Sequence, residues 1–231
     1  MKLPSILVRR FVAGETVDSA IAAGLALHAR GINSTFDLLG EDVLDREAAR
    51  RIAEANKELL RRIPSGVERN VSIKLTTMGL DIAEDFCREL ASGVLETARQ
   101  AGGFVRIDME SSKYTDATLD VFQTVWEIGH RMVGVVIQSA LKRAEADVRR
   151  VNALGARVRL VKGAYREARQ VAHQQKAEVD ASFVELMRLL LSEGTYPAIA
   201  THDPVMLQAT SDFAKAHGIG RDRFEFQMLY G

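Results

Sequence analysis

Cysteine is nearly absent from the sequence, and neither sign of charge dominates it. The single thiol, Cys87, excludes an internal disulfide and a metal site built from cysteines, and we expect it to be a small buried residue. Lysine plus arginine equals aspartate plus glutamate at 31 residues each, so no field favours nucleic acid or an acidic membrane surface. We find neither a signal-peptide pattern nor an apolar run of transmembrane length. The sequence therefore predicts a cytoplasmic globular protein that does not bind nucleic acid.

Several common functional motifs are also missing. There is no G-x-G-x-x-G fingerprint and no Walker loop, which argues against a Rossmann or P-loop nucleotide site. No H-x-x-x-H pair supports zinc binding, and no G-x-S-x-G supports a hydrolase triad. A site in this protein must therefore be sought elsewhere in the sequence.

Short β-like runs alternate with amphipathic helical stretches along most of the chain. A glycine follows each helical stretch, where it supplies a left-handed end to the helix. The helical stretches are Val17–Arg30, Ile82–Ala101, Lys142–Leu154, Ala177–Glu193 and Val205–His217. The β-like runs are Thr35–Leu39, Val71–Thr76, Phe104–Glu110, Val135–Ser139, Val158–Lys162, Ala198–Asp203 and Phe224–Leu229.

This alternation predicts parallel strands joined by helical crossovers, either in an open doubly wound sheet or in a closed barrel. Strands of an open sheet are covered on both faces, whereas these runs alternate apolar and polar residues, as in Val71, Ile73 and Leu75 against the residues between them. We therefore predict an α/β fold, a TIM-type (βα)8 barrel with only seven strands present in this chain. We expect one domain over 1–231, with a helical lead-in over 1–31 and the barrel over 34–231. An eighth strand would then be supplied elsewhere, or the chain would be part of a longer protein.

Each β-like run also places a polar residue where a barrel interior would ordinarily be apolar. These residues either satisfy one another as an ion layer, with Lys74 paired to Asp108 and Arg159 to Asp37, or they bind a polar ligand, because burying an unpartnered charge costs several kcal/mol. In this fold the active site lies at the carboxyl ends of the strands, which favours the ligand. The polar residues are Asp37, Lys74, Asp108, Gln138, Arg159, His202 and Gln227.

Two segments at strand ends suggest what that ligand is. The run Arg159–Tyr165 carries two cations, Arg159 and Lys162, followed by small residues that let a ligand approach the backbone. The run Thr201–Pro204 ends one strand and opens a helix, and a helix N-terminus is a natural phosphate site. Together they predict a phosphate-bearing cofactor held on a barrel.

These segments resemble the FAD-dependent proline dehydrogenases of the free-standing bacterial type, and also the corresponding domain of the proline utilization A proteins. The likeness covers nearly the whole chain in the family's order. The matching runs are Ser34–Glu41, Ser72–Thr76, Val105–Glu110, Val136–Ser139, Arg159–Tyr165, Ala200–Asp203 and Phe224–Gly231.

The resemblance implies FAD as cofactor and a set of residues that hold it. Arg159 would lie near the reactive edge of the flavin, and Gln138 would bond the pyrimidine side of its ring. The remaining cofactor residues would hold the ribityl and pyrophosphate parts or lie along the cofactor. They are Lys162, Gly163, Ala164, Thr201, His202 and Gln227.

The resemblance further implies the oxidation of L-proline to Δ1-pyrroline-5-carboxylate, by hydride transfer to flavin N5, as the first step of proline degradation. Lys74 would pair with the proline carboxylate, and Tyr165 and Leu229 would pack against the ring. Asp108 would orient the site, so the expected catalytic residues are Arg159, Lys74 and Asp108. The implied partners are a membrane quinone as electron acceptor and a pyrroline-5-carboxylate dehydrogenase. The protein would then be cytoplasmic, or peripheral on the inner face of the membrane.

The chain departs from the family in its extent. The family continues with an eighth strand and a final helix whose arginine pair clamps the proline carboxylate, and it also begins earlier. An incomplete, FAD-binding but weakly active or inactive fragment is therefore one alternative. The others are a lyase that forms a Schiff base on Lys74 or Lys162, and a non-enzymatic barrel whose open edges pair with another chain.

Overall fold

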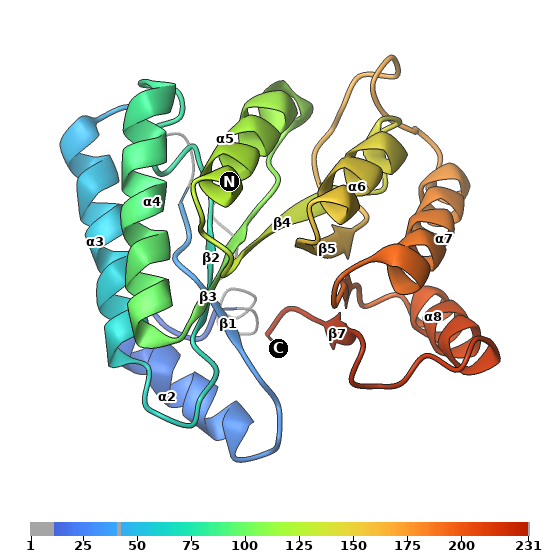
Figure 1. Ribbon diagram of the computed structural model, residues 1–231, viewed down its shortest axis with the longest axis horizontal. Helices are drawn as coiled ribbons and strands as arrows, with labels where there is room; N and C mark the ends of the chain where they lie inside the picture. Colours follow the sequence, from blue (N-terminus) through green and yellow to red (C-terminus); the bar gives the residue numbers. More distant parts are fainter. Residues whose placement is uncertain (1–11, 41–42, 231) are drawn as a thin grey trace. The chain divides into compact units, whose positions relative to one another are not determined.

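The computed structural model describes residues 12–40 and 43–230, in which helices and strands alternate along the chain (Figure 1). These residues form two compact units. The first lies within Met1–Arg106, Thr124–Met132 and Leu229–Gly231, and the second comprises Ile107–Gln123 and Val133–Met228. The predicted single domain over 1–231 stays a prediction. Part of its lead-in (1–11), with Glu41 and Gly231 of the matching runs, lies outside the described residues.

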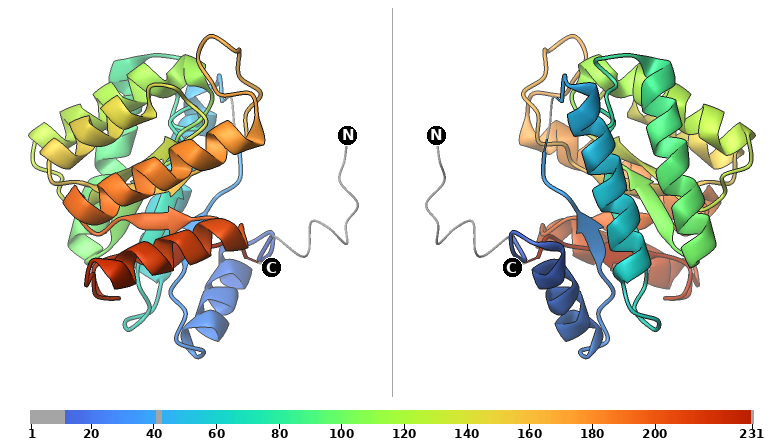
Figure 2. Two further views of the ribbon diagram at one scale, coloured as in Figure 1. Left: turned by 90° about the vertical axis from the view of Figure 1, so that its right-hand side faces the viewer. Right: turned by 90° about the vertical axis from the view of Figure 1, so that its left-hand side faces the viewer.

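The described part of the first unit contains three strands, and a helix precedes each of them in the sequence. Its strand order is β1-β2-β3, with β1 parallel to β2 and Asp37 opposite Ser72. Helices α3 and α4 pack against each other and lie side by side in Figure 2. The elements are α2 (Val17–His28), β1 (Thr35–Asp37), α3 (Arg46–Arg62), β2 (Asn70–Ile73), α4 (Glu84–Ala101) and β3 (Phe104–Ile107).

Helix α4 shows how the sequence pattern builds this unit. Phe86, Leu90 and Val94 recur at a spacing of four residues, so they share one face of the helix. All three are buried, and Cys87 beside them is fully buried, as predicted. Burial of apolar surface contributes about 25 cal/mol per Å², so this stripe stabilises the unit.

The second unit contains four parallel strands in the order β4-β5-β6-β7. In β5 the apolar Val158 and Leu160 are buried, whereas Arg157 and Arg159, which alternate with them, are partly exposed. One face of this strand is therefore polar. The elements are η1 (Ser112–Tyr114), α5 (Thr115–Glu127, its last turn assigned to the first unit), β4 (Val133–Gln138), α6 (Ala144–Ala153), β5 (Arg157–Val161), α7 (Lys176–Glu193), β6 (Ala198–Ala200), α8 (Pro204–Ala216) and β7 (Glu225–Gln227).

The strands end earlier than the predicted runs, so that both apolar residues, such as Leu75 and Met109, and polar residues lie beyond the strand ends. Lys74, Asp108 and Lys162 are each the first residue after a strand, and Gln138 and Gln227 are the last residues of theirs. The candidate site residues therefore lie where strands pass into loops, which is where this fold class keeps its sites.

The glycines predicted to end helices are mostly in the left-handed region. Gly31, Gly102, Gly155 and Gly218 have φ between 65° and 74°. Gly194 was predicted in the same way, and this was wrong, because its φ is −83° and the chain continues extended towards β6. Glycine is still required there, since an added Cβ would lie 2.6 Å from the carbonyl oxygen of Leu190. Among the described residues, no helix combines the length and apolar character needed to cross a membrane.

Candidate functional site

Arg159 on β5 is the centre of a polar cluster in the second unit. Its Nη1 pairs with Asp108 Oδ1 at 2.9 Å, and its Nε donates to Gln227 Oε1 at 2.6 Å. The Gln227 amide is oriented in turn by a bond from its Nε2 to Glu225. The side chains of Arg159 and Asp108 are only 14% and 18% exposed, so the pair is held in a partly desolvated place. Three predicted site residues thus come together on three elements.

Gln138, at the end of β4, fastens the loop that follows β3. It is 3% exposed, and its Nε2 donates to the carbonyl oxygens of Met109 and Glu110 at 3.1 and 2.8 Å. Because Nε2 makes these two bonds, the Oε1 atom of Gln138 points away from the two carbonyl groups. No described residue donates a hydrogen bond to this Oε1 atom. Gly163 has φ +105°, and an added Cβ would lie 2.8 Å from Gln138 Oε1. A side chain at Gly163 would therefore press against the Gln138 amide, and glycine avoids this contact.

Replacing Gly163 with alanine should destabilise the protein more than the same change at Gly129. Both glycines have positive φ, which costs an L-residue roughly 1–2 kcal/mol. Nothing lies within 4 Å of a Cβ at Gly129, whereas at Gly163 the Gln138 amide must move and loosen its bonds. We expect G163A to lose about 1–2 kcal/mol more than G129A in urea unfolding. Equal losses would show that the close approach to Gln138 is unimportant.

Lys162, the first residue after β5, lies between two carboxylates. Its Nζ donates to Asp180 Oδ1 at 2.5 Å and to Asp203 Oδ2 at 2.6 Å, and Lys176 on α7 contacts the same two carboxylates. Asp203 also caps α8, because its Oδ1 accepts from the Val205 N–H at 2.9 Å. The start of α8, which we predicted as a phosphate site, is therefore capped by the carboxylate of Asp203. This carboxylate also accepts a hydrogen bond from Lys162.

These contacts shift the pKa values of both carboxyl groups. The bond from Lys162 is the largest cause and lowers the pKa of Asp203 to about 2, assisted by the Val205 N–H. The pKa of Asp180 is lowered by Lys162 first and by Lys176 second. Asp180 was not identified from the sequence, since nothing in its helical spacing reveals that Lys162 reaches it.

The Asp203 carboxylate should contribute to stability in a pH-dependent way. Its folded pKa of about 2 lies below the ordinary 3.8, so the unfolded chain binds more protons in this window. Its contribution is therefore fully present above pH 3.8 and is lost as the pH falls towards 2. We expect D203N, which keeps the helix cap, to be less stable than wild type in urea at pH 7, and the difference to shrink at acid pH. D212N, an exposed change on α8, is the control; a pH-independent gap for D203N would contradict the assignment.

The remaining predicted residues of the second unit line the loops beyond the strand ends. Thr201 Oγ1 accepts from the Asp203 N–H at 3.0 Å, which shapes the turn into α8. Ala164, Tyr165 and His202 are exposed, with Tyr165 at 36%. The structure therefore leaves these three side chains accessible to a bound molecule.

Lys74 and Leu229 belong to the first unit. Lys74 follows β2 and pairs with Asp37 Oδ2 at 3.0 Å, and Leu229 is 70% exposed. The alternative to a bound ligand was an ion layer in which Lys74 paired with Asp108 and Arg159 with Asp37. Within the units, Lys74 contacts Asp37 and Arg159 contacts Asp108. The register explains it, because Asp37 lies opposite Ser72 and Lys74 is two residues further on the same face of the neighbouring strand.

Residues 12–40 and 43–230 contain a groove but no arrangement of residues typical of a metal site. No group of three or more histidine, cysteine, aspartate or glutamate residues there is arranged to hold a metal ion. A groove of about 600 Å³ lies beside α6 and α7, lined by charged residues such as Glu145, Arg149, Glu185 and Arg188. None of the predicted site residues lines it, so the polar clusters at the strand ends remain the candidate site.

A family model and individual relatives of this chain all carry the name proline dehydrogenase. A profile of the family described as proline dehydrogenase matches residues 20–231. Proline dehydrogenase of Deinococcus radiodurans is 40% identical over 233 residues, covering 97% of this chain and 74% of the relative. Proline dehydrogenase 2 of Bacillus subtilis subsp. natto is 38% identical over 227 residues, covering 98% of this chain and 74% of the relative.

The fold is also found in solved structures. Proline utilization A (PutA) from Bdellovibrio bacteriovorus, in a crystal structure of the protein inactivated by N-propargylglycine, superimposes with a TM-score of 0.88 at 27% identity. The match covers 98% of this chain and 28% of that one, so this chain spans about a quarter of the PutA protein. The likeness confirms the predicted fold class, a TIM-type α/β barrel fold, with seven strands among the described residues.

Proposed function

The chain belongs to the proline dehydrogenase family, and on this premise we propose that it is an oxidoreductase that converts L-proline to Δ1-pyrroline-5-carboxylate with FAD as cofactor. The observation that carries the proposal beyond the family is the Arg159 cluster. A partly buried guanidinium, fixed by Asp108 and Gln227, lies on the strand after the one that ends in Gln138.

The residues present fit a flavin nucleotide. A flavin ring has polar edges that need hydrogen-bond partners, and Gln138 offers an amide oxygen to which no described residue donates. A Cβ at Gly163 would lie 2.8 Å from that oxygen, and glycine keeps this position free of a side chain. Arg159 would supply a cation for negative charge on the ring, and Lys162 would supply one for the pyrophosphate. Ala164, Thr201 and His202 would complete the binding surface, with Gln227 holding Arg159.

When bound, a flavin would supply the acceptor for the hydride from C5 of proline. As the C5=N double bond forms, the N–H proton of the substrate would pass to solvent. The task of the protein is to orient the substrate and to stabilise charge. The Arg159 guanidinium would stabilise negative charge that develops beside it, and it needs little reorganisation because Asp108 and Gln227 already fix it.

The substrate would be held by a cation and by apolar side chains. Lys74, whose ammonium group lies 3.0 Å from Asp37 Oδ2, would pair with the proline carboxylate. Tyr165 and Leu229, both accessible, would pack against the ring. For the electrons we propose a membrane quinone as acceptor, reached by peripheral contact with the inner face of the membrane, and a pyrroline-5-carboxylate dehydrogenase as the enzyme that consumes the product.

The alternative of a Schiff-base lyase is disfavoured by the surroundings of both lysines. A nucleophilic lysine has to be neutral, which an apolar or cationic environment promotes. Lys74 instead contacts Asp37, and Lys162 contacts both Asp180 and Asp203. Carboxylates at these distances stabilise the ammonium form.

The proposed function is tested by turnover. The purified protein, supplied with FAD, is mixed with L-proline and a dye that accepts electrons, and reduction of the dye is followed. We expect reduction that depends on L-proline and saturates with its concentration, with D-proline as the control. Dye reduction at the same rate with either enantiomer, or none with L-proline, would contradict the proposal.

A further inference from the structure

The connection between β5 and α7 is fastened along its second half. Lys142 donates from its backbone N–H to Val171 O at 3.0 Å and from Nζ to Arg169 O at 2.7 Å. His173 N–H donates to Ala140 O at 2.8 Å. The part from Arg169 onwards is therefore fixed to the loop after β4. These bonds do not reach the part from Gly163 to Arg166.

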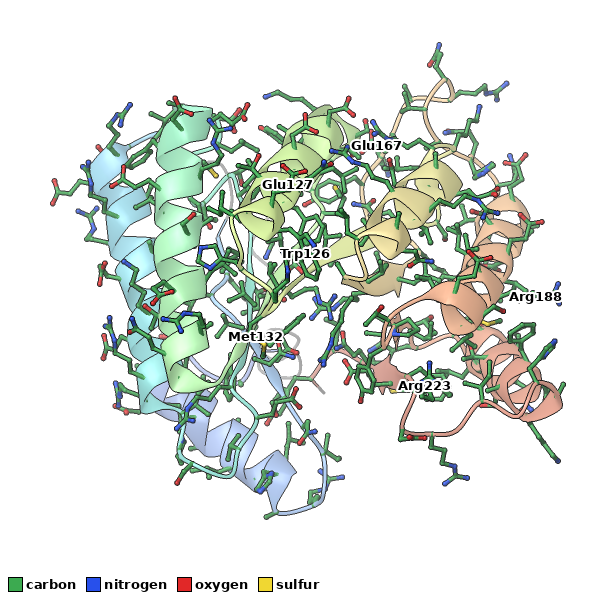
Figure 3. All side chains as sticks on the ribbon, in the orientation of Figure 1. Trp126, Glu127, Met132, Glu167, Arg188 and Arg223 are labelled. Atoms are coloured by element: carbon green, nitrogen blue, oxygen red, sulfur yellow. The ribbon has the colours of Figure 1, made fainter. Side chains whose placement is uncertain are left out.

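Glu167 bonds this connection to a different loop. Its Oε1 accepts from the Ser112 backbone N–H at 2.7 Å, and its Oε2 accepts from the Ser112 hydroxyl. Ser112 opens η1, so its N–H is one of the first-turn donors that lack a partner within the helix. A carboxylate is suited to this place, because it only accepts and is favoured at the positive end of a helix. Glu167 is labelled in Figure 3.

The loop that Glu167 reaches is itself held firmly. Gln138 binds the carbonyl groups of Met109 and Glu110 in this loop, and the same loop presents Asp108 to Arg159. By binding Ser112, Glu167 is therefore connected to the loop that carries Asp108 of the Arg159 cluster.

The segment Gly163–Arg166 is thus flanked by two anchored side chains. On one side Lys162 is bonded to Asp180 and Asp203, and on the other Glu167 is bonded to Ser112. Tyr165 lies between them and is accessible. A segment this short, fixed at both ends, leaves Tyr165 few positions.

We infer that Glu167 is a positioning residue that fixes the Gly163–Arg166 segment through Ser112 and so places Tyr165 for substrate. This inference rests on the proposed function for the identity of the substrate, but not for the tether itself. Losing the tether should free the segment locally without unfolding the protein.

The tether is tested by limited trypsin digestion of the whole protein, with cleavage after Arg166 and Arg169 quantified by mass spectrometry. Both arginines are exposed, and cleavage of a native loop follows the population of its open form. In E167Q one acceptor is lost, and we expect cleavage about tenfold faster. S112A keeps the backbone donor and should show a smaller increase. E145Q, the same change in an exposed ion pair on α6, should cleave as wild type does.

Kinetics then separate positioning from a merely structural role. With L-proline as substrate, E167Q should raise KM about tenfold while kcat changes less than threefold, with E145Q unchanged. Wild-type cleavage rates in E167Q would overturn the tether, and faster cleavage with an unchanged KM would overturn the placing of Tyr165. If wild type itself does not oxidise proline, the proposed function fails, and the cleavage rates alone decide whether Glu167 tethers the segment.

Discussion

Replacing Arg159 with methionine is expected to lower kcat/KM for L-proline by about 100- to 1000-fold, the effect of removing one preorganised group that stabilises developing charge. The side chain is largely buried, and two partners fix its guanidinium, so no solvent molecule reproduces its position. Methionine keeps much of the length and none of the charge. The measurement is dye-coupled proline oxidation over a range of proline concentrations.

Arg157 provides the matched control for Arg159. It lies on the same strand and the same face two residues earlier, where its guanidinium stacks over the Tyr196 ring. R157M therefore removes the same group from the amino end of β5, away from the predicted site. We expect its kcat/KM to stay within about threefold of wild type, as is usual for a cation–π contact of roughly 1 kcal/mol that serves stability. Equal losses in R157M and R159M would reduce Arg159 to a structural residue.

Replacing Lys74 with methionine is expected to raise the KM for proline roughly 10- to 100-fold with a smaller change in kcat. Hydrogen bonds to charged groups contribute about 1.5–3 kcal/mol. The substitution would remove the ammonium group that pairs with the carboxylate of the substrate. Methionine also leaves Asp37 without the ammonium group at 3.0 Å, and the remaining carboxylate should repel that of proline. Steady-state kinetics with L-proline separate the two parameters.

Two variants distinguish this role from an ion pair that only stabilises the fold. D37N removes the partner and leaves the Lys74 charge, so it should keep KM within about threefold if Lys74 serves the substrate. K57M removes a lysine of comparable burial in the same unit, 18% against 15% exposed, that pairs with Glu54. If D37N matched K74M in KM, or K57M did so, the proposed contact with the carboxylate would be wrong.

The sequence predicted the polar clusters because strand periodicity is short and strict. Successive residues of a strand point to opposite faces, so Arg159 between two buried apolar neighbours had to lie on the other face. Gln138 and Gln227 followed from the same alternation. The partner of Arg159 did not, because the choice between Asp37 and Asp108 depends on register and on where each strand ends.

Contacts between distant loops could not be predicted in this way. Ser112 and Glu167 are 55 positions apart, and no period or motif links them. Asp180 was missed for the same reason, since its partner Lys162 lies on another element. Helix α3 was also missed, although Asp45 caps its start by accepting from the Ala48 N–H at 2.7 Å. Its buried face consists of Ala49, Ala53, Asn56, Leu59 and Leu60 in a sequence rich in charged residues. Small and polar residues therefore stand where α4 has Phe86, Leu90 and Val94.

These residues should hold a flavin that proline reduces. To test this, the protein is loaded with FAD, free cofactor and oxygen are removed, and L-proline is added while the visible spectrum is recorded. We predict flavin absorption bands that remain with the protein and bleach with L-proline, and that stay unchanged with D-proline. A protein that retains no flavin, or whose bound flavin is not bleached by saturating L-proline, would show that these residues do not form a proline-reducible flavin site.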